Sequence, residues 1–223
     1  MTELVDTQGR LRSVADGAPQ PIGAVSKRTI DILLALVAIL LLAPLLAICL
    51  VATFLSSPGP ILFRHRRVGF NGKSFDCLKF RTMAADAEER LQRLLDSDQT
   101  AAAEWEAKRK LRNDPRVTAI GALLRESSLD ELPQLFNVLR GDMSIVGPRP
   151  VTPEELVRYE GAIDCYLACR PGITGIWQVS GRSTTTYAKR VELDTFYAQN
   201  WSIRLDARLM VSTIPSLFAD GAY

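Results

Sequence analysis

The longest apolar stretch of the chain covers residues 32–55, in which Thr53 is the one polar residue. A transmembrane helix needs about 20 apolar residues, and the apolar core of a signal peptide is shorter than this stretch. A core helix of a soluble protein would carry a polar stripe, which is missing here. The stretch therefore predicts a helix embedded in a membrane.

Two features favour a helix that enters and leaves the membrane by the same face. Pro44 lies in the middle of the stretch, where proline removes a backbone donor and breaks or kinks a helix. Basic residues favour the cytoplasmic side of a membrane and flank both ends here: Lys27, Arg28, Arg64, Arg66 and Arg67. A re-entrant hairpin satisfies this preference twice. A single-pass helix with a proline kink is the alternative.

The remaining pattern predicts a mostly helical α+β chain with one β-hairpin. Asn71-Gly72 lies between alternating apolar and polar residues, a strong signal for the hairpin turn. The spacing of apolar residues predicts helices over residues 84–111, 117–125, 185–198 and 202–218. Two Ser/Thr-x-x-Glu capping boxes, at residues 128–131 and 152–155, predict further helix starts, and the second helix is expected to reach about Cys169. Residues 176–179 are expected to be extended.

These patterns divide the chain into three regions. Residues 1–25 show no periodicity and are expected to form a disordered tail. Residues 26–57 form the expected membrane segment, and residues 58–223 the expected cytosolic catalytic domain. The last helix carries an apolar face beside Arg204 and Arg208, so it either lies on the membrane surface or packs on the core.

Composition narrows the chemistry. The 223 residues include 27 basic and 25 acidic side chains, and 7% are aromatic, so nothing in the balance favours a nucleic-acid partner. Four cysteines and the single His65 lack the spacing of a zinc site and are read as reduced thiols and a lone imidazole. Glycine-rich phosphate loops and serine-nucleophile motifs are absent as well. Carboxylate and arginine chemistry remain.

Asp130 and Glu131 are the candidate catalytic pair. Backbone N–H groups and the dipole of a helix start favour ionised carboxylates. An ionised aspartate can attack phosphorus, and a neighbouring glutamate can hold Mg²⁺. The alternative is that both residues only cap a helix.

Basic side chains supply candidate phosphate contacts. Arg149 lies between two prolines that fix the backbone around it, which suits a paired grip on a diphosphate; a surface ion pair is the alternative. Arg125 precedes the carboxylate pair. Lys79 and Arg81 are read as phosphate ligands or as neighbours of lipid headgroups. Arg182 is a weaker candidate, and Trp177 is read as a core or interface residue.

The order of these motifs resembles one known family. Its members share Lys27-Arg28-x-x-Asp31 before a proline-broken apolar run, Lys79-Phe80-Arg81-Thr82-Met83, Ser128-Leu129-Asp130-Glu131-Leu132-Pro133, and Gly147-Pro148-Arg149-Pro150. Over about residues 26–218 the chain resembles the monotopic phosphoglycosyl transferases, the bacterial sugar transferase family. The resemblance is nearest to small transferases that start exopolysaccharide synthesis with galactose-1-phosphate. Many members have Ser before the proline, where this chain has Ala43.

The resemblance implies both a fold and a reaction. It implies a re-entrant membrane helix broken at Pro44, plus a small cytosolic domain with amphipathic surface helices on the bacterial inner membrane. It implies that Asp130 attacks a UDP-sugar, expels UMP and passes the sugar-phosphate to undecaprenyl phosphate. Glu131 would hold Mg²⁺, and Arg125 and Arg149 would contact phosphate. Inner-membrane lipids and a homo-oligomer are further expected partners; nucleic acid is not.

Two rival functions stay open from the residues alone. A membrane-anchored scaffold of polysaccharide assembly would use Asp130 and Glu131 only as helix caps. A glycosyl transferase that moves sugar without phosphate would release UDP instead of UMP. The sugar, galactose or glucose, is not fixed by the residues.

Overall fold

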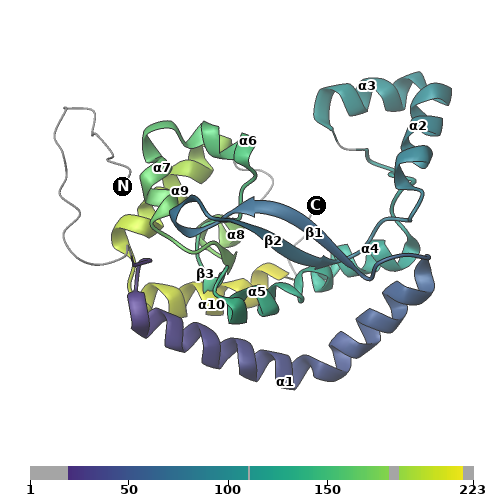
Figure 1. Ribbon diagram of the computed structural model, residues 1–223. Coiled ribbons are helices and arrows are strands. Elements are labelled where there is room, and N and C mark those ends of the chain that lie inside the picture. The colour runs from purple at the N-terminus through teal and green to yellow at the C-terminus, as the bar shows by residue number, and fades with distance from the viewer. Residues whose placement is uncertain (1–19, 110, 181–185, 218–223) are drawn as a thin grey trace, which may run out of the picture.

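The computed structural model describes residues 20–109, 111–180 and 186–217, and it confirms a mostly helical α+β chain with one long apolar helix and a small β-hairpin (Figure 1). Its longer elements are α1 (Ala24–Ser56), β1 (Leu62–Val68), β2 (Ser74–Phe80), α2 (Ala87–Ser97), α3 (Gln99–Lys108), α4 (Ala119–Glu126), α5 (Gln134–Arg140), α9 (Tyr187–Asn200) and α10 (Ile203–Leu217). Short elements are β3 (Ser144–Val146), α6 (Pro153–Leu156), α7 (Ile163–Leu167), β4 (Gly172–Thr174) and α8 (Ile176–Val179).

Helix α1 continues through Pro44 and bends near its middle, as Figure 1 shows. Within the described residues it is the one helix long and apolar enough to cross a membrane. Most of its large side chains are exposed; Leu40, Leu41 and Leu55 are each about three-quarters accessible to solvent. A continuous apolar surface of this kind is normally covered, either by protein or by another apolar phase.

Both ends of α1 are attached to the rest of the chain. Near its start, Lys27 Nζ lies 2.6 Å from Asp206 Oδ2 of α10, and Arg28 donates to the carbonyl oxygens of Val138 and Leu139. Near its end, Cys49 and Thr53 are buried, and Cys49 packs in the apolar cluster that contains Phe80 and Leu124. The helix therefore lies along the folded body instead of projecting from it.

The β-hairpin is formed as the sequence predicts. Strands β1 and β2 pair antiparallel with Val68 opposite Ser74 and Leu62 opposite Phe80. Asn71 and Gly72 adopt the positive φ values, 53° and 75°, that asparagine and glycine tolerate best. Asn137 of α5 fixes β2 because its Oδ1 accepts from Leu78 N and its Nδ2 donates to Asp76 O.

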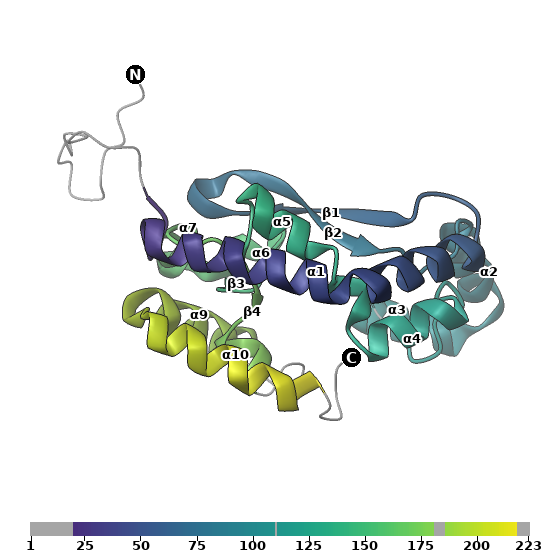
Figure 2. The same cartoon turned by 90° about the horizontal axis from the view of Figure 1, so that it is seen from below.

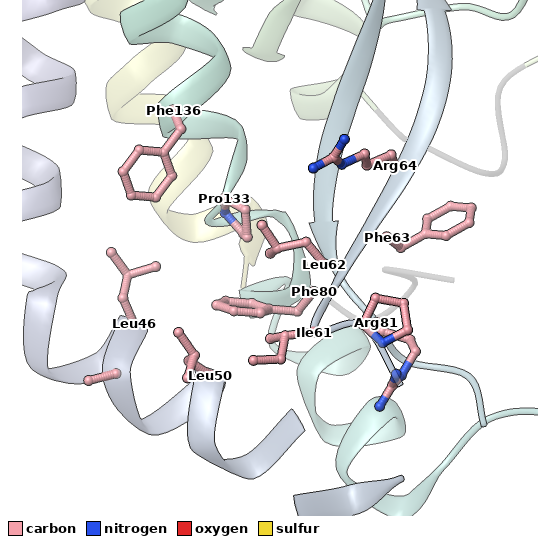
Figure 3. A pocket seen from close by; sticks show the side chains of 12 residues that line it. Leu46, Leu50, Ile61, Leu62, Phe63, Arg64, Phe80, Arg81, Pro133 and Phe136 are labelled. Carbon is pink, nitrogen blue, oxygen red and sulfur yellow. The ribbon is translucent and has the colours of Figure 1, made fainter. Parts of the chain in front are cut away.

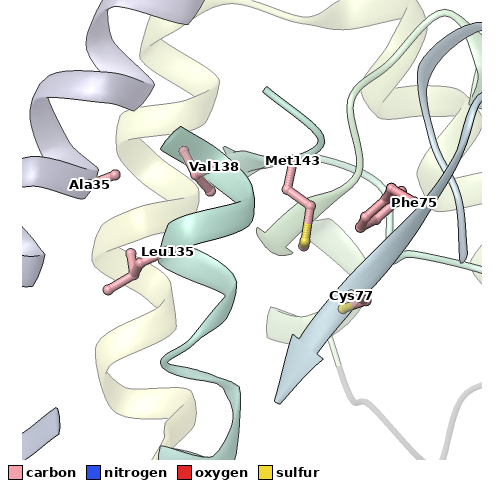
Figure 4. Packing of buried hydrophobic residues seen from close by; sticks show 6 residues of the cluster. All are labelled: Ala35, Phe75, Cys77, Leu135, Val138 and Met143. Carbon is pink, nitrogen blue, oxygen red and sulfur yellow. The ribbon is translucent and has the colours of Figure 1, made fainter. Parts of the chain in front are cut away.

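An apolar core joins α1, β2 and α5. Figure 4 shows Ala35 of α1 facing the α5 side chains Leu135 and Val138, with β2 on the other side of that helix. The remaining members of this buried cluster are Phe75, Cys77 and Met143. This packing holds the hairpin and α1 against the segment that carries the carboxylate pair.

Helix α10 has two apolar faces with different surroundings. Leu209 is buried with Tyr197 and Val146, whereas Ile203, Val211 and Ile214 are exposed. Figure 2 shows α10 and α1 along the face seen from below, with β1 and β2 beyond α1. Core packing, one of the two expectations for this helix, is confirmed for the side that carries Leu209. Whether the exposed side lies on a membrane surface stays a prediction.

Several local predictions were wrong. The helix expected over residues 84–111 is two helices divided at Asp98, and residues 176–179 form α8 instead of an extended piece. The helix expected from residue 152 begins with a true capping box at Thr152 and Glu155 but is interrupted at Glu160, whose φ is 44°. The capping box expected at Ser128 does not form, because Ser128 is left-handed and makes no side-chain cap. Residues 1–19, most of the expected tail, lie outside the described residues.

Candidate active site

Strand β2 and the turn between α4 and α5 bring three predicted residues together. Lys79 Nζ lies 2.6 Å from Glu131 Oε1 and 3.6 Å from Asp130 Oδ2. Asp130 is buried, whereas Lys79 and Glu131 remain partly accessible. A single ammonium group therefore bridges two adjacent carboxylates at the edge of the body.

The backbone around the carboxylate pair departs from regular helix. Ser128 has φ 56° and ψ 15°, and residues Leu129–Glu131 form one 3₁₀ turn before Pro133. A left-handed conformation costs a non-glycine residue on the order of 1–2 kcal/mol. Strained backbone of this kind is often found at functional sites, and here it lies two residues before Asp130.

Burial sets the titration of Asp130. Desolvation raises the pKa of its carboxyl group, and the negative charge of Glu131 adds to this rise. The charges of Lys79 and Arg125 act in the opposite direction and lower the pKa. An aspartate with a raised pKa is a stronger base and a better nucleophile once it is ionised.

Arg125 approaches the site through α4. Its Nε donates to Thr82 Oγ1 at 2.8 Å, a contact that sequence reasoning did not include. The approach depends on Gly121, because a Cβ there would lie 2.0 Å from the carbonyl oxygen of Thr82. The start of α4 therefore packs closely against Thr82, just after β2, and the charge of Arg125 acts on Asp130.

The loop that carries Arg149 is held by the short parallel pair β3 and β4. Gly172 N donates to Pro148 O at 2.8 Å, and Gly147 N donates to Thr174 O at 2.9 Å. A Cβ on Gly172 would lie 2.1 Å from Gly147 N, so glycine is required for this close approach. Burial lowers the pKa of Arg149, and the charge of Glu131 partly offsets this effect. Arg149 and the carboxylate pair therefore belong to one electrostatic site.

Trp177 belongs to the same region, where it packs between two arginine side chains. The guanidinium of Arg149 lies 5.1 Å from the Trp177 ring centroid, and that of Arg190 lies 5.3 Å from it. Arg190 was not singled out in the sequence. Arg182 lies outside the described residues.

An apolar groove of about 780 Å³ opens between α1 and the hairpin (Figure 3). Leu46 and Leu50 of α1 face Ile61 and Phe80 across it in the figure. Its lining also includes Pro133, three positions from Asp130, and the two cationic residues Arg64 and Arg81. Arg81 donates through Nη2 to the carbonyl oxygen of Ser57, while its buried Nε and Nη1 lack hydrogen-bond partners among the described residues. Arg81 thus lies at the groove.

The donor set suits Mg²⁺ in a limited way. In the described part of the chain, no cluster of three or more His, Cys, Asp or Glu side chains is present that would form an all-protein metal site. Mg²⁺ is usually held by one or two carboxylates together with substrate phosphates. Asp130 and Glu131 provide such a pair, so a metal–phosphate complex fits here.

Comparison with known proteins identifies relatives over nearly the whole chain. The exopolysaccharide production protein ExoY of Rhizobium meliloti is 50% identical over 208 residues, which cover 93% of this chain and 92% of the relative. The undecaprenyl-phosphate galactose phosphotransferase of Salmonella typhimurium is 48% identical over 88% of this chain, which corresponds to 41% of that longer protein.

A third relative acts on a different sugar. The UDP-glucose:undecaprenyl-phosphate glucose-1-phosphate transferase of Caulobacter vibrioides is 40% identical over 96% of this chain and 79% of its own length. The family profile described as bacterial sugar transferase matches residues 22–220. The chain therefore belongs to the bacterial sugar transferase family and is an enzyme of the sugar-phosphate transferase type.

Proposed function

We propose that the enzyme moves a sugar-1-phosphate, galactose or else glucose, from a UDP-sugar to undecaprenyl phosphate through a covalent intermediate on Asp130, and that UMP is released. The observation that carries this proposal is the buried Asp130 carboxylate, which lies beside Lys79 and Glu131. Asp130 comes three residues before Pro133, which lines an apolar groove. Exopolysaccharide synthesis is the setting that its relatives suggest.

In the first step, one carboxylate oxygen of Asp130 attacks the phosphorus that carries the sugar. A new oxygen–phosphorus bond forms, and the bond from that phosphorus to the bridging oxygen breaks. UMP leaves with the electron pair. Arg125 and Arg149 would stabilise the charge that develops on the phosphate oxygens, and stabilisation of this kind is usually the largest catalytic contribution.

In the second step, an oxygen of the lipid phosphate attacks the same phosphorus. The bond to Asp130 breaks, its electron pair returns to the carboxylate, and a sugar diphosphate lipid is released. One set of cationic groups then serves two anionic substrates in turn, so the two substrates never have to be bound together.

The groove supports the assignment of a lipid acceptor. Its walls are apolar, while Arg64 and Arg81 supply positive charge at the rim, an arrangement that suits a long hydrocarbon with a phosphate at one end. Leu46 and Leu50 come from the membrane helix itself. The acceptor's tail would therefore stay in the bilayer while its phosphate reaches Lys79 and Asp130.

Glu131, with Asp130, would hold the Mg²⁺ ion. A bound Mg²⁺ would supply positive charge to the phosphate oxygens and lower the barrier to displacement. Lys79 already occupies one side of Glu131, so this lysine and the metal would share the neutralisation of the carboxylate pair.

We also propose that α1 is re-entrant on the cytosolic face of the inner membrane. Support comes from its two attached ends, at Lys27 and at Cys49–Thr53, and from the exposed apolar surface between them. A 33-residue helix is about 50 Å long, more than a straight span needs. The bend near Pro44 lets both ends stay with the folded body.

The test of the reaction is the identity of the released nucleotide. Purified enzyme with UDP-galactose or UDP-glucose, undecaprenyl phosphate and Mg²⁺ is expected to release UMP in equal amount to the sugar-phosphate lipid. Release of UDP would instead show transfer of the sugar alone and would overturn the proposal. The test of topology is labelling of Val25→Cys and Ser57→Cys proteins with an impermeant maleimide. Both positions should react only from the cytosolic side.

A further inference from the structure

Five side chains behind the site form a continuous stack of alternating guanidinium groups and aromatic rings. Arg149 lies over Trp177, and Arg190 lies over both Trp177 and Tyr187, with distances to the ring centroids of 5.1, 5.3 and 5.1 Å. Arg158 lies 5.1 Å from the Tyr187 centroid at the other end. Each contact is within the range of a cation–π interaction.

Arg190 is the buried centre of this stack. Its side chain is 7% exposed, yet its Nε and Nη2 atoms have no hydrogen-bond partner among the described residues. The nearest carboxylate oxygens, those of Glu155 and Asp194, lie 3.8 and 3.9 Å away, beyond hydrogen-bond distance. Because two of its donors are unpaired, this guanidinium depends on its contacts with the Trp177 and Tyr187 rings to keep its position.

The residues around Arg190 limit how far it can move. Asp194 accepts a 2.7 Å hydrogen bond from the buried Tyr159 hydroxyl, and Glu155 is held by Arg67 at 2.9 Å. Tyr159 also packs edge-on to the Tyr187 ring at 6.1 Å. The carboxylates that face Arg190 are therefore committed to other partners. They line the space around Arg190 but lie too far from it for a hydrogen bond.

Arg149 is in the opposite situation. Among the described residues no carboxylate forms an ion pair with it, and its guanidinium lies over the Trp177 ring. A guanidinium without an ionic partner is available for an anionic ligand, but its orientation then depends on the ring beneath it. Whatever holds Trp177 in place therefore also determines where Arg149 points.

We propose that Arg190 is a positioning residue of the donor site: it fixes the indole of Trp177, and the indole presents Arg149 to the diphosphate of the UDP-sugar. The positive charge of Arg190 also adds to the field that attracts that diphosphate. This inference rests on the proposed function, because it takes Arg149 as a contact of the donor.

The role requires the flat guanidinium and not merely a positive charge. Lysine keeps the charge but has no plane to stack between two rings. Arg190→Lys is therefore expected to weaken donor binding about tenfold, and Arg190→Met by at least as much. In turnover, the KM for the UDP-sugar should rise with kcat little changed, while the KM for the lipid acceptor stays within about twofold of the wild-type value.

The experiment is titration calorimetry of the full-length enzyme in lipid nanodiscs, with UDP and Mg²⁺ as the probe. UDP carries the uridine and diphosphate common to both sugar donors and allows no turnover, so the covalent step does not enter the result. Arg158→Lys is the matched control, because Arg158 makes the same kind of ring contact at the exposed end of the stack. It should bind UDP within twofold of the wild type.

A second control separates positioning from loss of stability. Tyr159→Phe removes the hydroxyl bonded to Asp194 and should lower the unfolding temperature while UDP affinity stays within twofold. The inference is overturned if Arg190→Lys binds UDP as the wild type does, or if Tyr159→Phe weakens UDP binding as much as Arg190→Lys. Failure of the wild-type enzyme to bind UDP would count against the donor assignment itself, and would thus be recognisable as a different failure.

Discussion

Two groups of charged side chains in this molecule differ in their burial and in their partners. At the start of α1, the Asp206 carboxylate accepts from Lys27 Nζ at 2.6 Å, Tyr197 OH at 2.8 Å and Trp201 Nε1 at 3.0 Å. At the active site, Lys79 is divided between Asp130 and Glu131. The Asp206 carboxylate therefore accepts three hydrogen bonds from protein side chains, whereas Asp130 and Glu131 lie on either side of one ammonium group.

The difference indicates what each group is for. A buried charge whose partners all come from the protein stabilises a contact, here that of α1 with α10. A cluster of carboxylates and cations that includes a buried aspartate of raised pKa is typical of a site that acts on a ligand. Stability and chemistry therefore depend on separate clusters, and substitutions should separate them.

The largest expected effect is that of Asp130→Asn on turnover. Loss of the nucleophile should reduce kcat by at least about 10³-fold. The fold should not suffer: because burial raises the pKa of Asp130, its ionised form costs folding free energy at every pH above the ordinary aspartate pKa. The unfolding temperature at pH 7.5 should stay equal or rise. A variant that retains more than a tenth of wild-type turnover would contradict the assignment.

Lys27→Met is the converse substitution. It leaves the buried Asp206 carboxylate without its cation, which should cost about 3–5 kcal/mol of unfolding free energy. Denaturant unfolding in detergent measures this loss. Arg204→Met, on the exposed side of α10, is the control and should cost less than about 0.5 kcal/mol. If Lys27→Met leaves the free energy of unfolding unchanged, this ion pair does not hold α1 to α10.

Glu131→Gln sharpens the active-site half of the comparison. Removal of Mg²⁺ with EDTA should abolish transfer by the wild type, and Glu131→Gln should raise the Mg²⁺ concentration for half-maximal activity about tenfold. Glu126→Gln, at the exposed end of α4, should leave that concentration unchanged. Equal Mg²⁺ dependence in all three proteins would remove Glu131 from the metal site.

The smallest expected effect is a shift in pH dependence. Only ionised Asp130 can attack, so kcat/KM should fall at acid pH, at a pH above that of an exposed aspartate because burial raises its pKa. Lys79 lowers this pKa, so Lys79→Met should move the acid limb to higher pH. Lys73→Met at the exposed hairpin turn should not move it. A limb that stays in place would show that another group controls ionisation.

Much of the fold could be predicted because its signals are local. Asn71-Gly72 favours a hairpin turn wherever it occurs, and Thr152 with Glu155 closes its capping box within four residues. The same motif at Ser128 failed because Pro133 follows it. Pro133 has no backbone N–H to donate to a helix that began at Ser128, and α5 begins after it, at Gln134.

The site was predictable only in part. The carboxylate pair, Lys79, Arg125 and Arg149 were expected as ligands of phosphate or metal, and the structure places them in one region. Trp177 and Arg190 were not expected in this role. Their contacts connect α8 with α9 and with the Arg149 loop, and these segments are not neighbours in the sequence. The sequence offers one local hint, since Tyr187 and Arg190 are three residues apart on a helix and therefore neighbours.

Incubation of the enzyme with a UDP-sugar in the absence of lipid acceptor tests the central claim most directly. Mass spectrometry of the quenched protein should show one added hexose phosphate on the peptide that contains Asp130, together with an equal amount of free UMP. Addition of undecaprenyl phosphate should then remove the label. An unmodified protein that still forms the lipid product at full rate would contradict a covalent mechanism.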